Sequence, residues 1–190
     1  MHCGTGTLGK LAQSLAGHKA RSILIVTDRV IAKQRFFADL TSSLTSTGIS
    51  WKVVDNVASE PSIDDVQQAL EQAYACASNP VQAIVAIGGG SVMDTAKLIG
   101  VLWNASYQLA DLLDNSTLAV KQLPTFMVPT TCGTGSEATG NAIVALPALK
   151  TKKGIVNRQL IPDEVYLDPV TVSELPRHIV AATAVDALAH

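Results

Sequence analysis

The chain has 190 residues, of which 47% are hydrophobic and 16% are charged, and its formal net charge at neutral pH is −2. This length suits one domain with a substantial core, and the composition excludes a disordered chain. A charge so close to zero gives no electrostatic basis for binding nucleic acid or an acidic membrane surface.

The cysteines and the hydropathy pattern indicate a cytoplasmic protein. Cys3, Cys76 and Cys132 lie far apart and never form a C-x-x-C pair, which argues against a disulfide framework or a zinc finger. The first residues resemble no signal peptide, and no apolar run is long enough to span a membrane. We therefore expect neither a membrane nor a nucleic acid as partner.

The first glycine-rich motif is Gly4 to Gly9, a literal G-x-G-x-x-G. A dinucleotide fingerprint needs a strand before its glycines, and only three residues precede this one. We expect a loop that leads into a helix over residues 8–15, with the first strand of the domain missing.

Strands and helices then alternate with short connections. Three pairs follow one another, over residues 23–26 and 30–44, 49–54 and 62–77, and 83–87 and 91–103. Ser62 and Asp65 form a capping box at the start of the second helix. The alternation predicts an α/β fold with a Rossmann-like, doubly wound, mostly parallel sheet.

Three consecutive glycines, Gly88, Gly89 and Gly90, end the third of these strands. Glycine permits positive φ angles and lets a ligand approach the backbone. Ser91 is predicted to cap the following helix, with Asp94 as its capping-box partner. The free N–H groups of the first turn and the helix dipole would bind a phosphate or pyrophosphate. A plain tight turn is the alternative, although one or two glycines would suffice for it.

Asp28 directly follows the first strand and has two interpretations of equal weight. A carboxylate at the carboxyl end of such a strand commonly binds a ribose hydroxyl, and it can equally cap the next helix. In doubly wound sheets ligands bind beyond the carboxyl ends of the strands, where Asp28 and the three glycines both fall.

The second half of the chain contains another buried strand at 126–128, and a loop over residues 129–137 follows it. This loop is rich in hydroxyl groups and glycine, so it could donate to phosphate, ribose or a carboxamide, or be an ordinary surface loop. We expect a hairpin around residues 147–153, with Lys152 and Lys153 as solvated charges at its tip, and a short strand at 164–167.

A final helix of small and apolar residues begins at Pro176 and carries Asp186 and His190 one turn apart. A carboxylate and an imidazole at this spacing can share a divalent metal. From spacing alone, an ordinary pair of polar residues on one helix face is the stronger interpretation, since two ligands do not make a site.

Together these motifs resemble the iron-dependent (group III) alcohol dehydrogenase family. The resemblance rests on Thr27-Asp28, GGGSVMDTAK over 88–97, PTTCGTGSE over 129–137 and ATAVDALAH over 182–190. It runs through nearly the whole chain. The second and third of these motifs are specific to the family.

The resemblance implies a role for each matching position. Asp28 would face the adenosine ribose, and Gly88, Gly89, Gly90 and Ser91 would hold the pyrophosphate. The other cofactor contacts would be Thr130, Thr131, Thr139 and Lys152, and the first two metal ligands would be Asp186 and His190. Glu60 stands where the family usually has Asn.

The resemblance also implies a function. The protein would be an NAD(P)-linked oxidoreductase that transfers hydride between nicotinamide and a small alcohol or aldehyde bound to Fe²⁺ or Zn²⁺. Asp28 would favour NAD over NADP as the cofactor. A homodimer is a possible assembly. Residues 1–175 would form the dinucleotide-binding domain and 176–190 the first helix of a helical metal-binding domain, so we expect the chain alone to be inactive. The alternatives are a non-catalytic nucleotide-binding fragment and a lyase or synthase of the dehydroquinate-synthase-like fold, against which the 129–137 motif argues.

Overall fold

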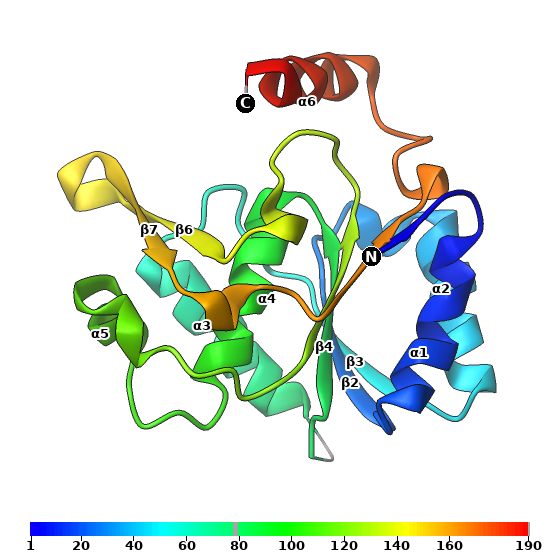
Figure 1. Ribbon diagram of the computed structural model, residues 1–190, viewed down its shortest axis with the longest axis horizontal. Coiled ribbons are helices and arrows are strands. Elements are labelled where there is room, and N and C mark those ends of the chain that lie inside the picture. Colours follow the sequence, from blue (N-terminus) through cyan, green and yellow to red (C-terminus); the bar gives the residue numbers. More distant parts are fainter. Residues whose placement is uncertain (78–79, 190) are drawn as a thin grey trace.

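The computed structural model describes residues 1–77 and 80–189. Its main sheet has six strands in the order β1-β8-β5-β4-β2-β3, and every neighbouring pair runs parallel (Figure 1). The strands are β1 (His2–Cys3), β2 (Ser22–Val26), β3 (Ser50–Val54), β4 (Ala83–Gly88), β5 (Thr125–Pro129) and β8 (Glu164–Leu167).

Helices cover both faces of this sheet (Figure 1). Helices α1 (Leu11–Gly17) and α2 (Arg35–Ser46) pack against one face, together with Ile23 and Ile25. Helices α3 (Ile63–Cys76), α4 (Gly90–Leu102) and α5 (Leu109–Asp114) pack against the other, together with Leu24 and Val26. Alternate residues of β2 thus enter opposite cores, which is why its four buried residues, Ile23 to Val26, are all apolar. The predicted doubly wound α/β fold is confirmed.

The order of winding reverses between β2 and β4. The chain places β3 on one side of β2 and then returns to place β4 on the other side. Val26 pairs with Ala86, so Asp28 and Gly88 each lie two residues beyond the same rung. Such a reversal opens a crevice at the carboxyl edge of the sheet, and this is where doubly wound proteins bind ligands.

Local signals placed some helix boundaries correctly. Helix α3 begins with the predicted capping box: Ser62 Oγ accepts from the Asp65 N–H at 3.2 Å, and Asp65 Oδ2 accepts from the Ser62 N–H at 2.8 Å. The helix expected over 30–44 is instead a 3₁₀ turn (Ile31–Lys33) followed by α2, because Gln34 is extended and interrupts it.

The prediction that no strand precedes the first glycine motif was wrong. His2 and Cys3 form β1 and pair with Tyr166 and Leu167 of β8. Two residues carry no hydropathy period, so this strand gives no signal in the sequence. The motif itself leads, as expected, through a 3₁₀ turn (Thr7–Lys10) into α1.

The expected hairpin is formed by β6 (Asn141–Leu146) and β7 (Thr151–Val156), which pair antiparallel. Its tip is a 3₁₀ turn over Pro147–Leu149 followed by Lys150 in the left-handed region at φ 47°. Lys152 and Lys153 therefore lie within β7, and placing them at the tip was wrong.

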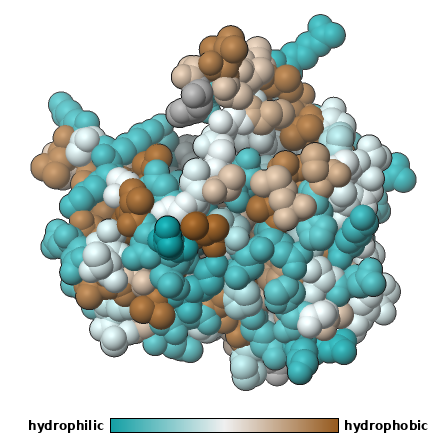
Figure 2. Space-filling model, viewed as in Figure 1, coloured by the Kyte–Doolittle hydropathy of each residue, from teal (hydrophilic) through white to brown (hydrophobic). Residues whose placement is uncertain are grey.

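Helix α6 (Arg177–Ala189) lies apart from the sheet, beyond its carboxyl edge (Figure 1). None of its described residues is buried, and Val185 and Leu188 are 65% and 87% exposed. Hydrophobic residues accordingly gather on it at the surface (Figure 2). It approaches the domain at Gly133, where a Cβ atom would stand 2.4 Å from the Thr183 carbonyl oxygen. Among the described residues, no helix is both long and apolar enough to cross a membrane.

Candidate functional site

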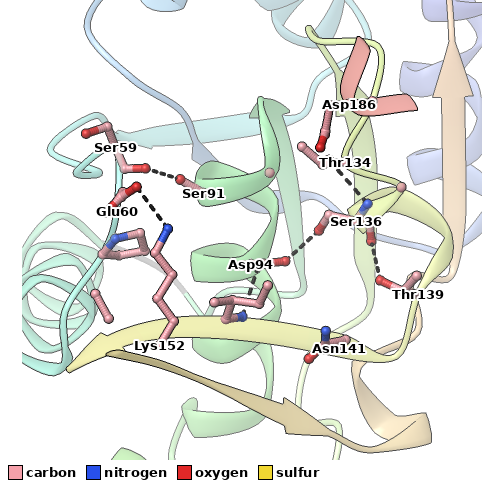
Figure 3. A pocket seen from close by; sticks show the side chains of 16 residues that line it. Ser59, Glu60, Ser91, Asp94, Thr134, Ser136, Thr139, Asn141, Lys152 and Asp186 are labelled. Carbon is pink, nitrogen blue, oxygen red and sulfur yellow. Dashed lines mark hydrogen bonds and ion pairs between the residues drawn. The ribbon is translucent and has the colours of Figure 1, made fainter. Parts of the chain in front are cut away.

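A cleft of about 690 Å³ opens at the carboxyl edge of the sheet (Figure 3). Five parts of the chain line it: the loop after β3, the start of α4, the 129–137 loop, the β6–β7 hairpin and α6. Polar and charged side chains of the lining include Glu60, Ser91, Asp94, Ser136, Thr139, Lys152 and Asp186. The topology thus brings together segments that are far apart in the sequence.

The three glycines connect β4 to α4. Gly88 ends the strand, Gly89 is the N-cap and Gly90 is the first helical residue. None of the three has a positive φ, so the turn does not use the left-handed angles that glycine permits. Glycine is needed here because neighbouring atoms leave little room for a side chain. A Cβ atom would stand 2.6 Å from Val92 Cβ at Gly88, and at Gly90 it would stand 3.0 Å from Thr134 Cγ2.

The start of α4 faces the cleft with backbone groups. Gly90 and Ser91 both line the cleft, and the N–H groups of a first helical turn have no acceptor within the helix. Together with the positive end of the helix dipole, they are suited to an anion. The missing side chains at the turn leave the backbone accessible.

The predicted capping box at Ser91 and Asp94 was wrong. Because Gly89 is the N-cap, Ser91 is the second helical residue and Asp94 the fifth, which is too far along for a capping-box partner. The Ser91 hydroxyl instead donates to the Ser59 carbonyl. Ser91 thereby connects the loop after β3 to the first turn of α4.

Asp94 belongs to a buried polar network under the cleft (Figure 3). Its Oδ1 accepts from Ser136 Oγ at 2.6 Å, and its Oδ2 accepts from the Ile143 N–H at 2.9 Å. Lys97 Nζ donates to Ser136 Oγ at 3.0 Å and to the Asn141 carbonyl at 2.8 Å. Burial lowers the pKa of the Lys97 ammonium, and the carboxylate of Asp94 opposes that shift. The network joins α4 to the 129–137 loop and to β6.

Sequence reasoning missed Lys97 as part of this site. The available signal was a Lys three residues after an Asp in a helix that is otherwise uncharged. Such a pair on one face of a buried helix needs a partner or a shared environment.

The three predicted threonines have different surroundings. Thr130 is buried, and its N–H donates to the Gly88 carbonyl at 3.0 Å, so it ties the 129–137 loop to the glycine turn. Thr131 Oγ1 is buried and finds no hydrogen-bond partner in the described part of the chain. It lies 3.4 Å from where a Cβ of Gly89 would stand. Thr139 lines the cleft directly.

Asp28 caps the turn that follows β2. Its Oδ1 accepts from the N–H groups of Val30 at 2.8 Å and Ile31 at 2.9 Å. This is the capping interpretation left open from the sequence. Asp28 does not belong to the lining of the cleft, and its ribose role stays a prediction.

The charged residues at the mouth of the cleft come from three elements. Lys152 of β7 places Nζ 2.9 Å from Glu60 Oε1. Asp186 of α6 lines the cleft, and its Oδ2 lies 3.0 Å from where a Cβ of Gly133 would stand. His190, the other predicted metal ligand, lies outside the described residues.

Comparison with known proteins adds to this geometry. The family model "Iron-containing alcohol dehydrogenase" matches residues 1–169. Sulfoacetaldehyde reductase of Bilophila wadsworthia is 33% identical over 187 residues, which are 98% of this chain and 48% of the relative. Long-chain-alcohol dehydrogenase 1 of Geobacillus thermodenitrificans is 34% identical, with 100% of this chain and 47% of the relative covered. The chain therefore spans about half the length of these relatives.

Solved structures show the same likeness. NADH-dependent butanol dehydrogenase A of Thermotoga maritima matches with a TM-score of 0.85 at 28% identity, covering 100% of this chain and 48% of the other. Sulfoacetaldehyde reductase of Bifidobacterium kashiwanohense, in complex with NAD⁺, matches with a TM-score of 0.87 at 25% identity, covering 97% and 48%. As its motifs predicted, the chain belongs to the iron-containing alcohol dehydrogenase family.

Proposed function

We propose that this chain is the dinucleotide-binding part of an NAD(P)-linked oxidoreductase that interconverts a small alcohol and its aldehyde. Residues 1–175 would form the binding domain, and residues 176–190 would be the first helix of a second, helical domain. The observation that carries the proposal is the cleft at the start of α4, the helix that follows β4, at the carboxyl edge of a doubly wound sheet.

The pyrophosphate of the cofactor would bind the N–H groups of Gly90 and Ser91. The glycine turn supports this placement, because side chains at Gly88, Gly89 and Gly90 would meet neighbouring atoms or fill the approach. The Thr131 hydroxyl, buried beside Gly89, is a suitable donor for the same group. Thr130 would act indirectly, by holding the loop against the turn.

The remaining cofactor contacts would come from the rim. Asp28 would accept a hydrogen bond from the adenosine ribose with the carboxylate oxygen that does not cap the turn, which favours NAD over NADP. Thr139 and Lys152 line the cleft and would contact the nucleotide from the 129–137 loop side and from the hairpin.

A metal ion, when bound, would polarise the alcohol oxygen while nicotinamide accepts the hydride. We propose Asp186 and His190 as two ligands of Fe²⁺ or Zn²⁺. Within the described residues, no three His, Cys, Asp or Glu side chains are grouped to hold a metal, and a catalytic site typically uses three. We therefore propose cofactor binding as the role of these residues.

The test is NAD⁺ binding to the 190-residue chain by titration calorimetry, with Gly90→Val as the variant. A valine at this position would occupy the approach to the first turn, so we expect affinity to fall at least about tenfold. Gly9→Val is the matched control, because it alters the other glycine motif where a Cβ meets nothing within 4 Å. Circular dichroism checks that both variants fold. Unchanged NAD⁺ affinity in a folded Gly90→Val variant would contradict the proposal.

A further inference from the structure

The cleft has an unusual charge balance for a site that would hold a pyrophosphate. Among the described residues that line it, three are carboxylates, namely Glu60, Asp94 and Asp186, and Lys152 is the single cation. The carboxylate of Asp94 is paired with the buried ammonium of Lys97, and Lys97 does not line the cleft. Lys152 is therefore the one side-chain cation of the described lining that an anionic ligand can meet.

Lys152 is already engaged. Its Nζ lies 2.9 Å from Glu60 Oε1, across the mouth of the cleft between β7 and the loop after β3 (Figure 3). The two side chains are 53% and 65% exposed, so packing does not fix the pair and solvent screens it. Exposed pairs of this kind are weak enough to exchange partners.

The position of Glu60 is held by its neighbour. The Ser59 carbonyl accepts a hydrogen bond from the Ser91 hydroxyl, and Ser91 lies in the first turn of α4. The loop is thereby fastened beside the N–H groups proposed to bind the pyrophosphate. Glu60 consequently lines the same cleft as those N–H groups, with its carboxylate on Lys152.

We propose that Glu60 competes with the pyrophosphate of the dinucleotide for Lys152. The inference rests on the proposed function. Binding would exchange the carboxylate of Glu60 for a phosphate at Lys152 Nζ and leave Glu60 unpaired beside the bound anion. Glu60 thus lowers the affinity for the cofactor and favours its release.

The test compares Glu60→Gln with wild type in NAD⁺ binding. Glutamine keeps the size of the side chain, removes its charge and frees Lys152, so we expect affinity to rise roughly two- to fivefold, the range of an exposed charge pair. Lys152→Gln should weaken binding, and Glu60→Gln should gain less when combined with it. Asp64→Asn and Lys153→Gln are the matched controls, since both residues are exposed and neither lines the cleft.

Two further probes identify the group concerned. ADP should gain affinity in Glu60→Gln as NAD⁺ does, whereas adenosine, which carries no phosphate, should bind equally to both proteins. The variant's NAD⁺ affinity should also fall more steeply with added salt than that of wild type, because salt weakens the competing pair in wild type as well.

Equal or weaker NAD⁺ binding by Glu60→Gln, with wild type binding measurably, would overturn the inference and leave the proposed function standing. An equal gain for adenosine would overturn it too, because the effect would not act on the phosphates. If neither wild type nor variant binds NAD⁺, the proposed function is wrong and the inference falls with it.

Discussion

Lys97 Nζ lies 3.6 Å from Asp94 Oδ1, and the side chains of the two residues are 0% and 10% exposed. They lie three residues apart on α4, the helix whose first turn faces the cleft. Each also contacts the hairpin strand β6, through the Asn141 carbonyl and the Ile143 N–H. The shape of the cleft floor thus depends on a charged pair inside a hydrophobic core.

Replacing Lys97 with Met should strongly destabilise the chain. Methionine has nearly the same length, but it would leave the Asp94 carboxylate buried without its cation, which costs about 3–5 kcal/mol. Urea unfolding followed by circular dichroism measures the loss. Lys153→Met, at an exposed position of β7, should change stability by less than about 0.5 kcal/mol.

Adding Asp94→Asn to Lys97→Met should recover part of that loss, because the second change removes the unpaired charge. If Lys97→Met alone lowers the free energy of unfolding by less than about 1 kcal/mol, the Lys97–Asp94 pair does not stabilise the packing of α4.

Gly88→Ala should also destabilise, for a steric reason. The new Cβ would stand 2.6 Å from Val92 Cβ, and rotation of the Val92 side chain cannot move that atom. The helix start must therefore shift, at about 1–3 kcal/mol. Gly17→Ala is the control, because a Cβ there meets nothing within 4 Å and should be neutral or stabilising by up to about 1 kcal/mol. Equal unfolding midpoints for the two variants would refute the close-packing argument.

The sequence predicted the features that depend on neighbouring residues. The apolar strands, the Ser62–Asp65 capping box and the glycine turn all have short-range signals, and each was found. Of the two properties of glycine considered for the turn, the small size is the one that the structure uses, because none of the three glycines has a positive φ. Only packing against Val92 and Thr134 reveals that difference.

The features that escaped prediction depend on residues distant in the chain. Asp94 bonds Ser136, 42 positions away, and Lys152 pairs with Glu60, 92 positions away. From the sequence, Asp94 was predicted to pair with Ser91 in a capping box, and Lys152 was predicted to be a solvated charge. No short sequence pattern encodes a contact that the sheet topology creates. The strand β1 was not predicted for a related reason, since its two residues form a strand only by pairing with β8.

Glu164 gathers partners from three elements at the start of β8. Its Oε1 accepts from Ser14 Oγ at 2.6 Å and lies 2.8 Å from His18 Nε2, and its Oε2 accepts from Tyr166 Oη at 2.7 Å and lies 2.9 Å from His2 Nε2. Burial opposes ionisation of this carboxyl, but the four hydrogen bonds outweigh it and lower its pKa to about 2.

This cluster predicts an acid-dependent loss of stability. The folded pKa of Glu164 lies below the value of about 4.3 expected when unfolded, so its stabilisation is present above that value and is lost as the pH falls toward 2. Glu164→Gln should be less stable than wild type at pH 6, and the difference should shrink between pH 4.5 and 2.5 in urea titrations. Glu174→Gln, at an exposed position, should show no such trend. A difference that stays constant with pH would rule out the carboxylate as its source.

Asp28 offers a prediction about the choice between NAD and NADP. Its Oδ1 caps the turn after β2, so Asp28→Asn keeps the acceptor for the cap and removes only the charge. The 2′-phosphate of NADP would no longer be repelled, and a change of about 1–2 kcal/mol for an interaction at the surface would raise NADP affinity about five- to thirtyfold. The affinity for NAD⁺ should fall a few-fold, because a neutral amide accepts a weaker hydrogen bond from the ribose.

Arg29, exposed beside Asp28, would attract the same 2′-phosphate, so Arg29→Gln should lower NADP affinity and leave NAD⁺ affinity unchanged. Calorimetric titration of both cofactors into the three proteins decides the matter: an NADP-to-NAD affinity ratio that is the same in wild type and Asp28→Asn would exclude Asp28 from the ribose site.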